Sequence, residues 1–96
     1  MTLTDIKNKL IALKPELHER FGVSEIGLFG SWVRGEQTET SDIDVLVSFD
    51  RLVTLFEIIE LQFALEDIFE RKVDVAVKGE LKKYIGQHIM QEVEML

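Results

Sequence analysis

Two aspartates, Asp42 and Asp44, lie two residues apart at the start of the strand-like run 43–47. A β-strand has a side-chain period of two, so both carboxylates are expected on one face. Like charges placed this close repel unless a cation lies between them. The alternative is that Asp42 is a turn residue and Asp44 a solvated strand residue. Magnesium fits the pair best, because it takes one or two carboxylates and completes its shell with water and substrate phosphates. The pair therefore predicts a divalent-metal site.

The turn before this pair has the features of a phosphate-binding site. Gly30 and Ser31 follow the apolar run 26–29, and the residues after Gly30 can begin a short helix. The first N–H groups of a helix have no partner within the helix, so they point toward an anion such as a triphosphate. Gly30 has no side chain, which lets a phosphate approach closely. Together with the two aspartates, this turn outlines a site for nucleotidyl transfer.

Three residues around this turn have two interpretations each. Arg34 can pair with a phosphate or the leaving pyrophosphate, or it can brace the loop by binding Glu36 or Asp42. Ser41 can orient Asp42, or it can be a simple turn residue before the strand. Trp32 is expected to pack in the turn, with stacking on adenine as the alternative.

The spacing of these residues carries a family resemblance. The pattern consists of Gly30-Ser31, Arg34-Gly35 and Ser41-Asp42-Ile43-Asp44. Chance agreement at its specified positions is on the order of one in a hundred million at a given start. The chain resembles, over nearly its whole length, the minimal nucleotidyltransferases, which are the MNT-type branch of the DNA polymerase beta superfamily. Val33 departs from the family pattern, which often has a small residue there, and this bears on packing of the turn.

The resemblance implies a set of site residues and a mechanism. Asp42, Asp44 and Asp74 would be the catalytic carboxylates and would hold two magnesium ions. One ion would grip the triphosphate of ATP, and the other would lower the pKa of the attacking hydroxyl, so that pyrophosphate leaves from the alpha-phosphorus. Asp74 would also accept the proton of that hydroxyl. The implied nucleotide-binding residues are Gly30, Ser31 and Arg34.

Asp74 is also notable without the family pattern. It is the one acid within the otherwise apolar run 73–77. A charge in such a strand needs a reason, because burying it without a partner is costly. The strand period assigns it to the same face as Asp42 and Asp44. The alternative is an edge-strand aspartate that faces solvent.

Length, charge and residue usage limit the remaining possibilities. Ninety-six residues are expected to form one domain, residues 1–96, with a modest core. A net charge of −7 argues against a nucleic-acid template, since backbone binding draws on clustered Lys and Arg. Neither a signal peptide nor a membrane-spanning apolar run is visible, so we expect a cytoplasmic protein that does not engage a membrane. With no cysteine and only two histidines, a zinc site is not expected.

Apolar periodicity predicts alternating helices and strands. The first helix begins near Thr2, is kinked or split at Pro15 and ends at Gly22. Strands are expected over 23–29, 42–48 and 72–77, and further helices over 52–69 and from Leu81 to about Val93.

The connections between these elements predict the sheet. The short loop between the first two strands favours antiparallel pairing, whereas the helix between the second and third favours a right-handed parallel crossover. The expected fold is α/β (α+β), a polymerase beta-like nucleotidyltransferase fold. It has a small mixed three-stranded sheet of order 1-2-3 and helices on one face, which leaves the carboxylate face open for substrate. One edge of that sheet is expected to gather Ser31, Asp42, Asp44 and Asp74.

The expected helix 52–69 is apolar on nearly every side. Such a helix is normally buried on more than one side, and a three-stranded sheet cannot cover all of it. We therefore expect an interface there, with a second copy or with another protein. The alternative is tight packing against the first and last helices.

The function predicted is metal-dependent transfer of AMP, or another NMP, from an NTP to a hydroxyl group. The chain stops soon after Asp74, so the acceptor must bring its own binding surface. The resemblance implies that the acceptor is a HEPN-type toxin, or a similar helical protein, which this chain neutralises as antitoxin. The alternative is a catalytically silent binding module that acts by contact alone. The intact Asp42, Asp44 and Asp74 argue against that alternative.

Overall fold

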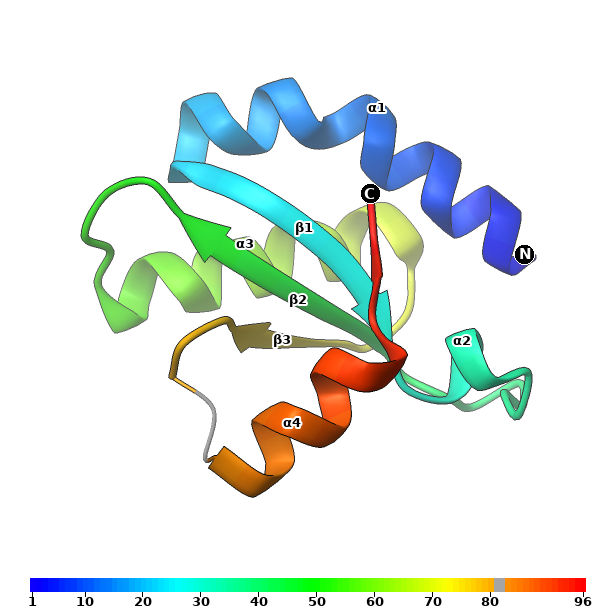
Figure 1. Cartoon of the computed structure of the whole chain (residues 1–96). Helices are drawn as coiled ribbons and strands as arrows, with labels where there is room; N and C mark the ends of the chain where they lie inside the picture. The colour runs from blue at the N-terminus through cyan, green and yellow to red at the C-terminus, as the bar shows by residue number, and fades with distance from the viewer. Residues whose placement is uncertain (81–82) are drawn as a thin grey trace.

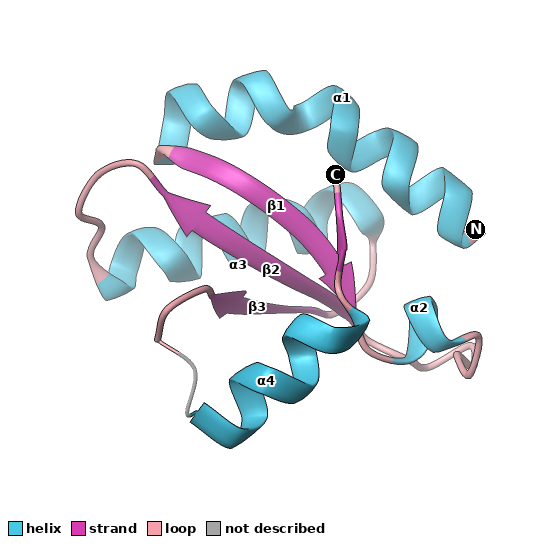
Figure 2. Cartoon of the chain, viewed as in Figure 1, coloured by secondary structure: helices cyan, strands magenta, loops and turns pink. Residues whose placement is uncertain are grey.

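The computed structural model describes residues 1–80 and 83–96 of the chain. Figure 1 shows these elements from blue to red along the chain, and Figure 2 separates helices from strands. Within the described ranges, no helix is long and apolar enough to cross a membrane. In chain order the elements are α1 (Leu3–Phe21), β1 (Val23–Phe29), α2 (Ser31–Arg34), β2 (Ile43–Phe49), α3 (Leu55–Phe69), β3 (Val73–Val77), α4 (Lys83–Glu92) and β4 (Glu94–Met95).

Helix α1 has the ends that the sequence predicts. Thr2 and Asp5 form a capping box, in which each side chain accepts a hydrogen bond from the other residue's backbone N–H. Gly22 ends the helix with a φ of 77°, a left-handed conformation that glycine adopts at little cost. Pro15 lies inside a single continuous helix, so the split considered at this residue does not occur.

The sheet has four strands in the order β3-β2-β1-β4, so the expectation of a three-stranded sheet of order 1-2-3 is wrong. The predicted antiparallel β1–β2 and parallel β2–β3 pairings are present. The addition is β4, which pairs antiparallel with β1 opposite Gly27 and Leu28. Gly27 permits this close approach, because a Cβ there would lie 2.7 Å from the sulfur of Met95. A strand of two residues has no alternation from which the sequence could predict it.

The expectation that all helices pack on one face is also wrong. Helices α1 and α3 cover one face, and α4 lies on the other, where it appears in front of the sheet in Figure 1. Leu46 points to the same face as Asp44 and is fully buried, so that face is partly covered rather than open. The main core lies between α1, α3 and the opposite face of the sheet. Its members include Ile6, Leu10, Leu17, Ile26, Leu28, Ile43, Val45, Val47, Leu61, Leu65 and Val73.

Helix α3 begins three residues later than the sequence predicts. Thr54 is its N-cap and forms a capping box with Glu57, so Leu52 and Val53 precede the helix. One side of α3 is buried in the main core, but packing in this fold leaves its outer side exposed. The predicted last helix corresponds to α4, and its first expected residues, Leu81 and Lys82, lie outside the described residues.

Candidate active site

The two strand pairings bring the predicted carboxylates to one end of the sheet. Phe29, the last residue of β1, lies opposite Asp44, and Asp44 lies opposite Asp74 on the parallel strand β3. Asp42 directly precedes β2. We call this group of Asp42, Asp44 and Asp74 the acid edge. Asp74 is exposed on an edge strand, and the other two carboxylates are half-buried.

The turn after β1 passes directly over the acid edge. Gly30 is buried and has a φ of 80°, a conformation that residues with a side chain rarely adopt. A Cβ built on Gly30 would lie only 2.0 Å from Oδ2 of Asp44. Glycine is therefore required twice here, by the backbone conformation and by the nearby carboxylate. The next residue, Ser31, opens the short helix α2 beside the acid edge.

The surroundings of Asp44 disfavour its charged form. Burial raises the pKa of Asp44 to about 6, and the negative charges of Asp74 and Asp42 add to the effect. The Arg34 guanidinium opposes this rise in pKa, whereas the Glu92 carboxylate reinforces it. Asp44 therefore lies where a cation would lower the free energy of the ionised site.

The Arg34 side chain binds two carboxylates, as its interpretation as a brace predicts, and its interpretation as a phosphate ligand stays a prediction. Its Nε donates to Oε2 of Glu36 at 3.2 Å, and one of its terminal nitrogens donates to both carboxylate oxygens of Glu92, at 3.2 and 2.9 Å. These hydrogen bonds raise the pKa of Arg34. The partner in the loop is Glu36 rather than Asp42, and the second partner comes from α4.

Glu92 is a site residue that the sequence reasoning missed. It lies at the end of α4, is half-buried and is close enough to Asp44 to influence its pKa. The sequence analysis expected all helices on the face opposite the carboxylates, so it did not place α4 near Asp44. A charged residue three positions after the buried Ile89 was the only signal in the sequence.

Arg71 was also missed, and it holds the loop that carries Asp42. Its guanidinium donates to the backbone carbonyls of Glu39 and Ser41, each at 3.1 Å. The same group lies 5.2 Å from the centre of the Trp32 ring, a cation–π distance. The structure favours one of the two interpretations for Trp32 and one for Ser41. Trp32 is buried and packs in the turn, and Ser41 is a turn residue whose Oγ accepts from the N–H of Thr38 at 2.8 Å.

Comparison with known proteins agrees with this geometry. A family model described as "Nucleotidyltransferase domain" matches residues 10–95. The chain belongs to this nucleotidyltransferase family. The match includes the Gly30 turn and the whole acid edge. The prediction of a minimal nucleotidyltransferase is confirmed.

This nucleotidyltransferase has a close relative in an archaeon. It is 47% identical over 93 residues to the protein adenylyltransferase MntA of Thermococcus cleftensis, covering 97% of this chain and 94% of the relative. A solved structure of a putative minimal nucleotidyltransferase matches with a TM-score of 0.83 and 31% identity, over 100% of this chain and 97% of that one.

Two further solved structures are toxin–antitoxin complexes. One, crystallised with AMP-PNP, matches with a TM-score of 0.77 and 26% identity, over 92% of this chain and 69% of that one. The other contains a tri-AMPylated HEPN toxin of Shewanella oneidensis with its MNT antitoxin. It matches with a TM-score of 0.68 and 22% identity, over 92% of this chain and 66% of that one. At that identity, the second likeness is one of fold.

The donor chemistry of this nucleotidyltransferase fits magnesium. No group of three or more His, Cys, Asp or Glu side chains in residues 1–80 and 83–96 is arranged to hold a metal ion. Magnesium does not need such an enclosure, because it takes one or two protein carboxylates and completes its shell with water and phosphates. Asp42, Asp44 and Asp74 supply hard oxygen donors of the required kind.

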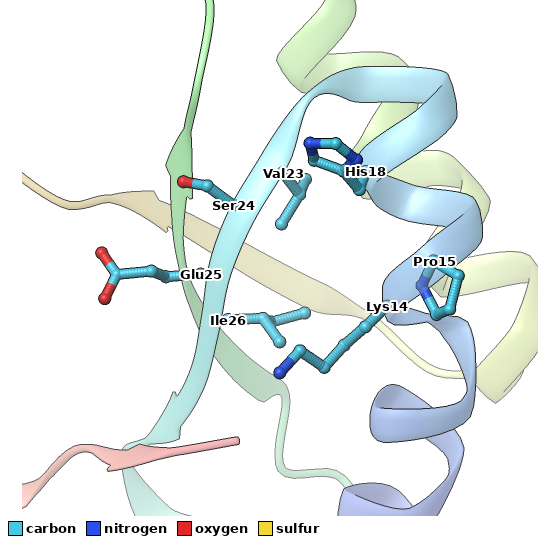
Figure 3. Close-up of a pocket in the computed structure, with 7 residues that line it drawn as sticks. All are labelled: Lys14, Pro15, His18, Val23, Ser24, Glu25 and Ile26. Atoms are coloured by element: carbon cyan, nitrogen blue, oxygen red, sulfur yellow. The ribbon is translucent and has the colours of Figure 1, made fainter.

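A cavity of about 250 Å³ lies away from the acid edge, between α1 and β1 (Figure 3). Its lining includes Lys14 and His18 from the helix and Ser24 and Glu25 from the strand. None of the predicted site residues of the nucleotidyltransferase lines it. The acid edge, not this cavity, has the donors that nucleotidyl transfer requires.

Proposed function

We propose that this nucleotidyltransferase transfers AMP from ATP to a hydroxyl side chain of a HEPN-type toxin, or a similar helical protein, and so acts as its antitoxin. The observation that carries the proposal is the register that sets Asp44 opposite Asp74, with the Gly30 turn passing over Asp44. That arrangement sets a glycine turn that suits a phosphate beside carboxylates whose charges a cation would neutralise. The adenylyltransferase relative supports AMP as the transferred group.

The nucleotide is the first part of the mechanism. The Gly30 turn and the beginning of α2 would bind the β and γ phosphates of ATP through backbone N–H groups and the Ser31 hydroxyl. Arg34, which now binds Glu36 and Glu92, is adjacent and has the planar fork that suits a phosphate. The AMP-PNP complex of a 26% identical neighbour supports ATP as the substrate.

Asp42, Asp44 and Asp74 would hold magnesium, for which we propose two ions. When bound, magnesium neutralises phosphate charge and lowers the pKa of the attacking hydroxyl. The acceptor oxygen forms a bond to the alpha-phosphorus, the bond from that phosphorus to the bridging oxygen breaks, and pyrophosphate leaves with the electron pair. Asp74, the exposed member of the acid edge, accepts the hydroxyl proton on a carboxylate oxygen.

The partner is the second part of the proposal. The toxin–antitoxin complex that is 26% identical to this chain supports a toxin as the acceptor. The HEPN identity of that toxin rests on the family resemblance and on the fold likeness to the Shewanella oneidensis antitoxin. We further propose a cytoplasmic location, because ATP and the toxin would both be available there. Tyrosine is the hydroxyl side chain that we expect to be modified.

Intact-mass measurement tests this function. The helical protein that co-purifies with this chain from its native host is incubated with ATP and magnesium, and with either the wild-type chain or Asp74→Asn. We expect the partner's mass to increase by one or more AMP units with wild type only. Tight binding with unchanged mass for both proteins would instead favour the module that acts by contact alone.

A thermal-shift grid of ATP and magnesium tests the metal. The protein supplies only part of the coordination shell, so magnesium should raise the melting temperature mainly when ATP is present. Calcium and EDTA serve as controls. Equal stabilisation by ATP with and without magnesium would contradict a metal at the acid edge.

A further inference from the structure

An apolar stripe runs along the outer side of α3 and the turn before it. We call it the docking stripe; it consists of Leu52, Leu55, Phe56, Ile59 and Phe63. The exposed fractions are 98% for Leu52, 69% for Leu55, 78% for Phe56, 36% for Ile59 and 62% for Phe63. Within α3, spacings of three and four residues place Leu55, Phe56, Ile59 and Phe63 next to one another on one helix face, and Leu52 lies in the segment before it.

The docking stripe is large for a surface with no partner. A phenylalanine presents on the order of 200 Å², so these fractions leave on the order of 600 Å² of apolar area. That is the upper end of what a monomeric protein exposes in one patch, and patches of this size usually mark interaction sites. With its polar border, the stripe approaches the roughly 800 Å² that one partner contributes to a standard interface.

The stripe begins at the opposite end of the sheet from the acid edge and reaches the middle of α3 at Phe63. Strand β2 runs away from the acid edge, and α3 begins at its far end and returns to β3 (Figure 1). Phe56 precedes Phe69, the last residue of α3, by thirteen positions, which places it roughly 20 Å from the acid-edge end. The stripe is therefore a separate surface from the nucleotide site.

The border of the stripe is acidic, and this favours another protein over a second copy of this chain as the occupant. Glu60 and Asp67 are exposed and lie along the same border of α3, beside Phe56 and Phe63. No salt bridge involves either of them in the described part of the chain. In a two-fold pair of copies, both copies would present these carboxylates along one border. Like charges across an interface are costly, and the chain already carries a net charge of −7.

We propose that the docking stripe binds an apolar helix of the acceptor protein, one that carries Lys or Arg along the side that meets Glu60 and Asp67. This rests on the proposed function only in taking the acceptor to be a protein. To contact the whole stripe, the acceptor must then span roughly 20 Å from Phe56 to the acid-edge end of α3. A short peptide that contains the acceptor hydroxyl cannot do so and is a poor substrate.

The main test measures binding without ATP, so that it does not depend on transfer. Calorimetry uses the helical protein that co-purifies with this chain from its native host. The double variant Phe56→Ser/Phe63→Ser should bind at least about 100-fold more weakly, because both side chains are exposed anchors. The matched control is Ile11→Ser, an exposed apolar residue on α1, which should bind within about twofold of wild type. Both proteins should melt near the wild-type temperature.

A second variant tests the charge. Glu60→Gln/Asp67→Asn keeps the shape of the border, and it should weaken binding about tenfold and reduce its dependence on salt. Sedimentation of the chain alone tests the other occupant. A dimer that Phe56→Ser/Phe63→Ser dissociates, or that Glu60→Gln/Asp67→Asn strengthens, would overturn the proposal in favour of a second copy.

Failure of docking and failure of function give different results. Full binding by Phe56→Ser/Phe63→Ser would overturn the docking proposal, even if the partner gains AMP normally. Loss of binding in that variant, with no AMP added by wild type, would leave the docking stripe in place and remove the enzyme function. When both proposals hold, Phe56→Ser/Phe63→Ser transfers AMP slowly at low partner concentration, and its rate approaches that of wild type at high partner concentration.

Discussion

The two ends of the sheet are each unfavourable in the isolated chain, but for opposite reasons. At the acid edge, carboxylates crowd together, and burial and their charges raise the pKa of Asp44 to about 6. At the other end, the docking stripe leaves Phe56 and Phe63 exposed to water. Excess charge is relieved by a cation, whereas apolar exposure is relieved by an apolar partner. The kind of unfavourable surface thus indicates the kind of ligand.

This difference has a consequence for stability. Neutralising a residue at the acid edge removes repulsion within the folded chain, so the chain should become no less stable as it loses activity. Shortening a residue of the docking stripe removes contacts that the isolated chain does not make. Its stability should then stay level while binding is lost. The following substitutions test the acid-edge half of this contrast.

The largest effect is expected from Asp44→Asn. The amide keeps the shape of the carboxylate but cannot neutralise a cation, so AMP transfer should fall by roughly 1,000-fold. The melting temperature should stay level or rise. Labelled-ATP transfer and circular dichroism melts on the same preparation measure both quantities. Glu19→Gln, an exposed neutralisation on α1, is the control and should change neither. If Asp44→Asn transfers at the wild-type rate, Asp44 is not part of the site.

Gly30→Ala should have the next largest effect. Its Cβ would lie 2.0 Å from Oδ2 of Asp44, so the carboxylate must move and transfer should fall roughly 100-fold. The backbone at Gly30, with a φ of 80° and a ψ of −158°, is almost exclusive to glycine, so the substitution should also cost roughly 1–3 kcal/mol of stability. Gly35→Ala is a matched control, because Gly35 has a φ of 73° and no atom within 4 Å of the added Cβ. Gly35 is in the αL region, so this variant should lose only about 1 kcal/mol of stability and keep its activity. Equal activity loss in both variants would attribute the effect to strain alone.

A smaller effect concerns pH and the metal-free protein. The pKa of Asp44 is about 6 in the folded chain, above its ordinary value of 3.8, so folding favours the protonated carboxyl. That stabilisation is complete below about pH 4 and is lost as the pH rises through about 6. In EDTA, the free energy of unfolding of wild type should fall over this pH range by on the order of 1 kcal/mol relative to that of Asp44→Asn. This value is reduced because Asp44 is half-exposed. Urea unfolding at several pH values measures this difference. A difference that is constant with pH would contradict the crowding of charge.

The smallest effect is expected from Glu92→Gln. It weakens the hold of α4 on Arg34 and removes a negative charge near the triphosphate site. The KM for ATP should therefore fall by about threefold, with kcat little changed. Initial rates against ATP concentration measure it, and Glu36→Gln, which leaves the Glu92 contact in place, is the comparison. An increase in KM would mean that Glu92 positions Arg34 for phosphate binding.

Much of the fold could be predicted because local patterns and connection lengths agree. The period-two pattern predicted β1, β2 and β3 to within a residue or so, and the connecting loop and helix predicted their pairings. That register alone sets Asp44 opposite Asp74.

The missed features depend on contacts between distant parts of the chain. Strand β4 consists of two residues and exists through its pairing with Gly27 and Leu28. The contact between Glu92 and Arg34 follows from the side of the sheet on which α4 packs, and no local pattern encodes that side. The same holds for Arg71, whose role appears only when its carbonyl partners in the loop before β2 are known.

The short β4 pairing has a consequence for the order in which the chain closes. Bringing Met95 beside Gly27 closes most of the chain into one loop, and its entropy cost is offset only after the β1–β2 hairpin exists. Amide hydrogens at β4, including that of Leu96, which donates to Ile26 at 2.9 Å, should exchange with solvent sooner than those of central β2. Opening of β4 would release the C-terminal anchor of α4, the helix that lies on the side of the sheet carrying Asp44.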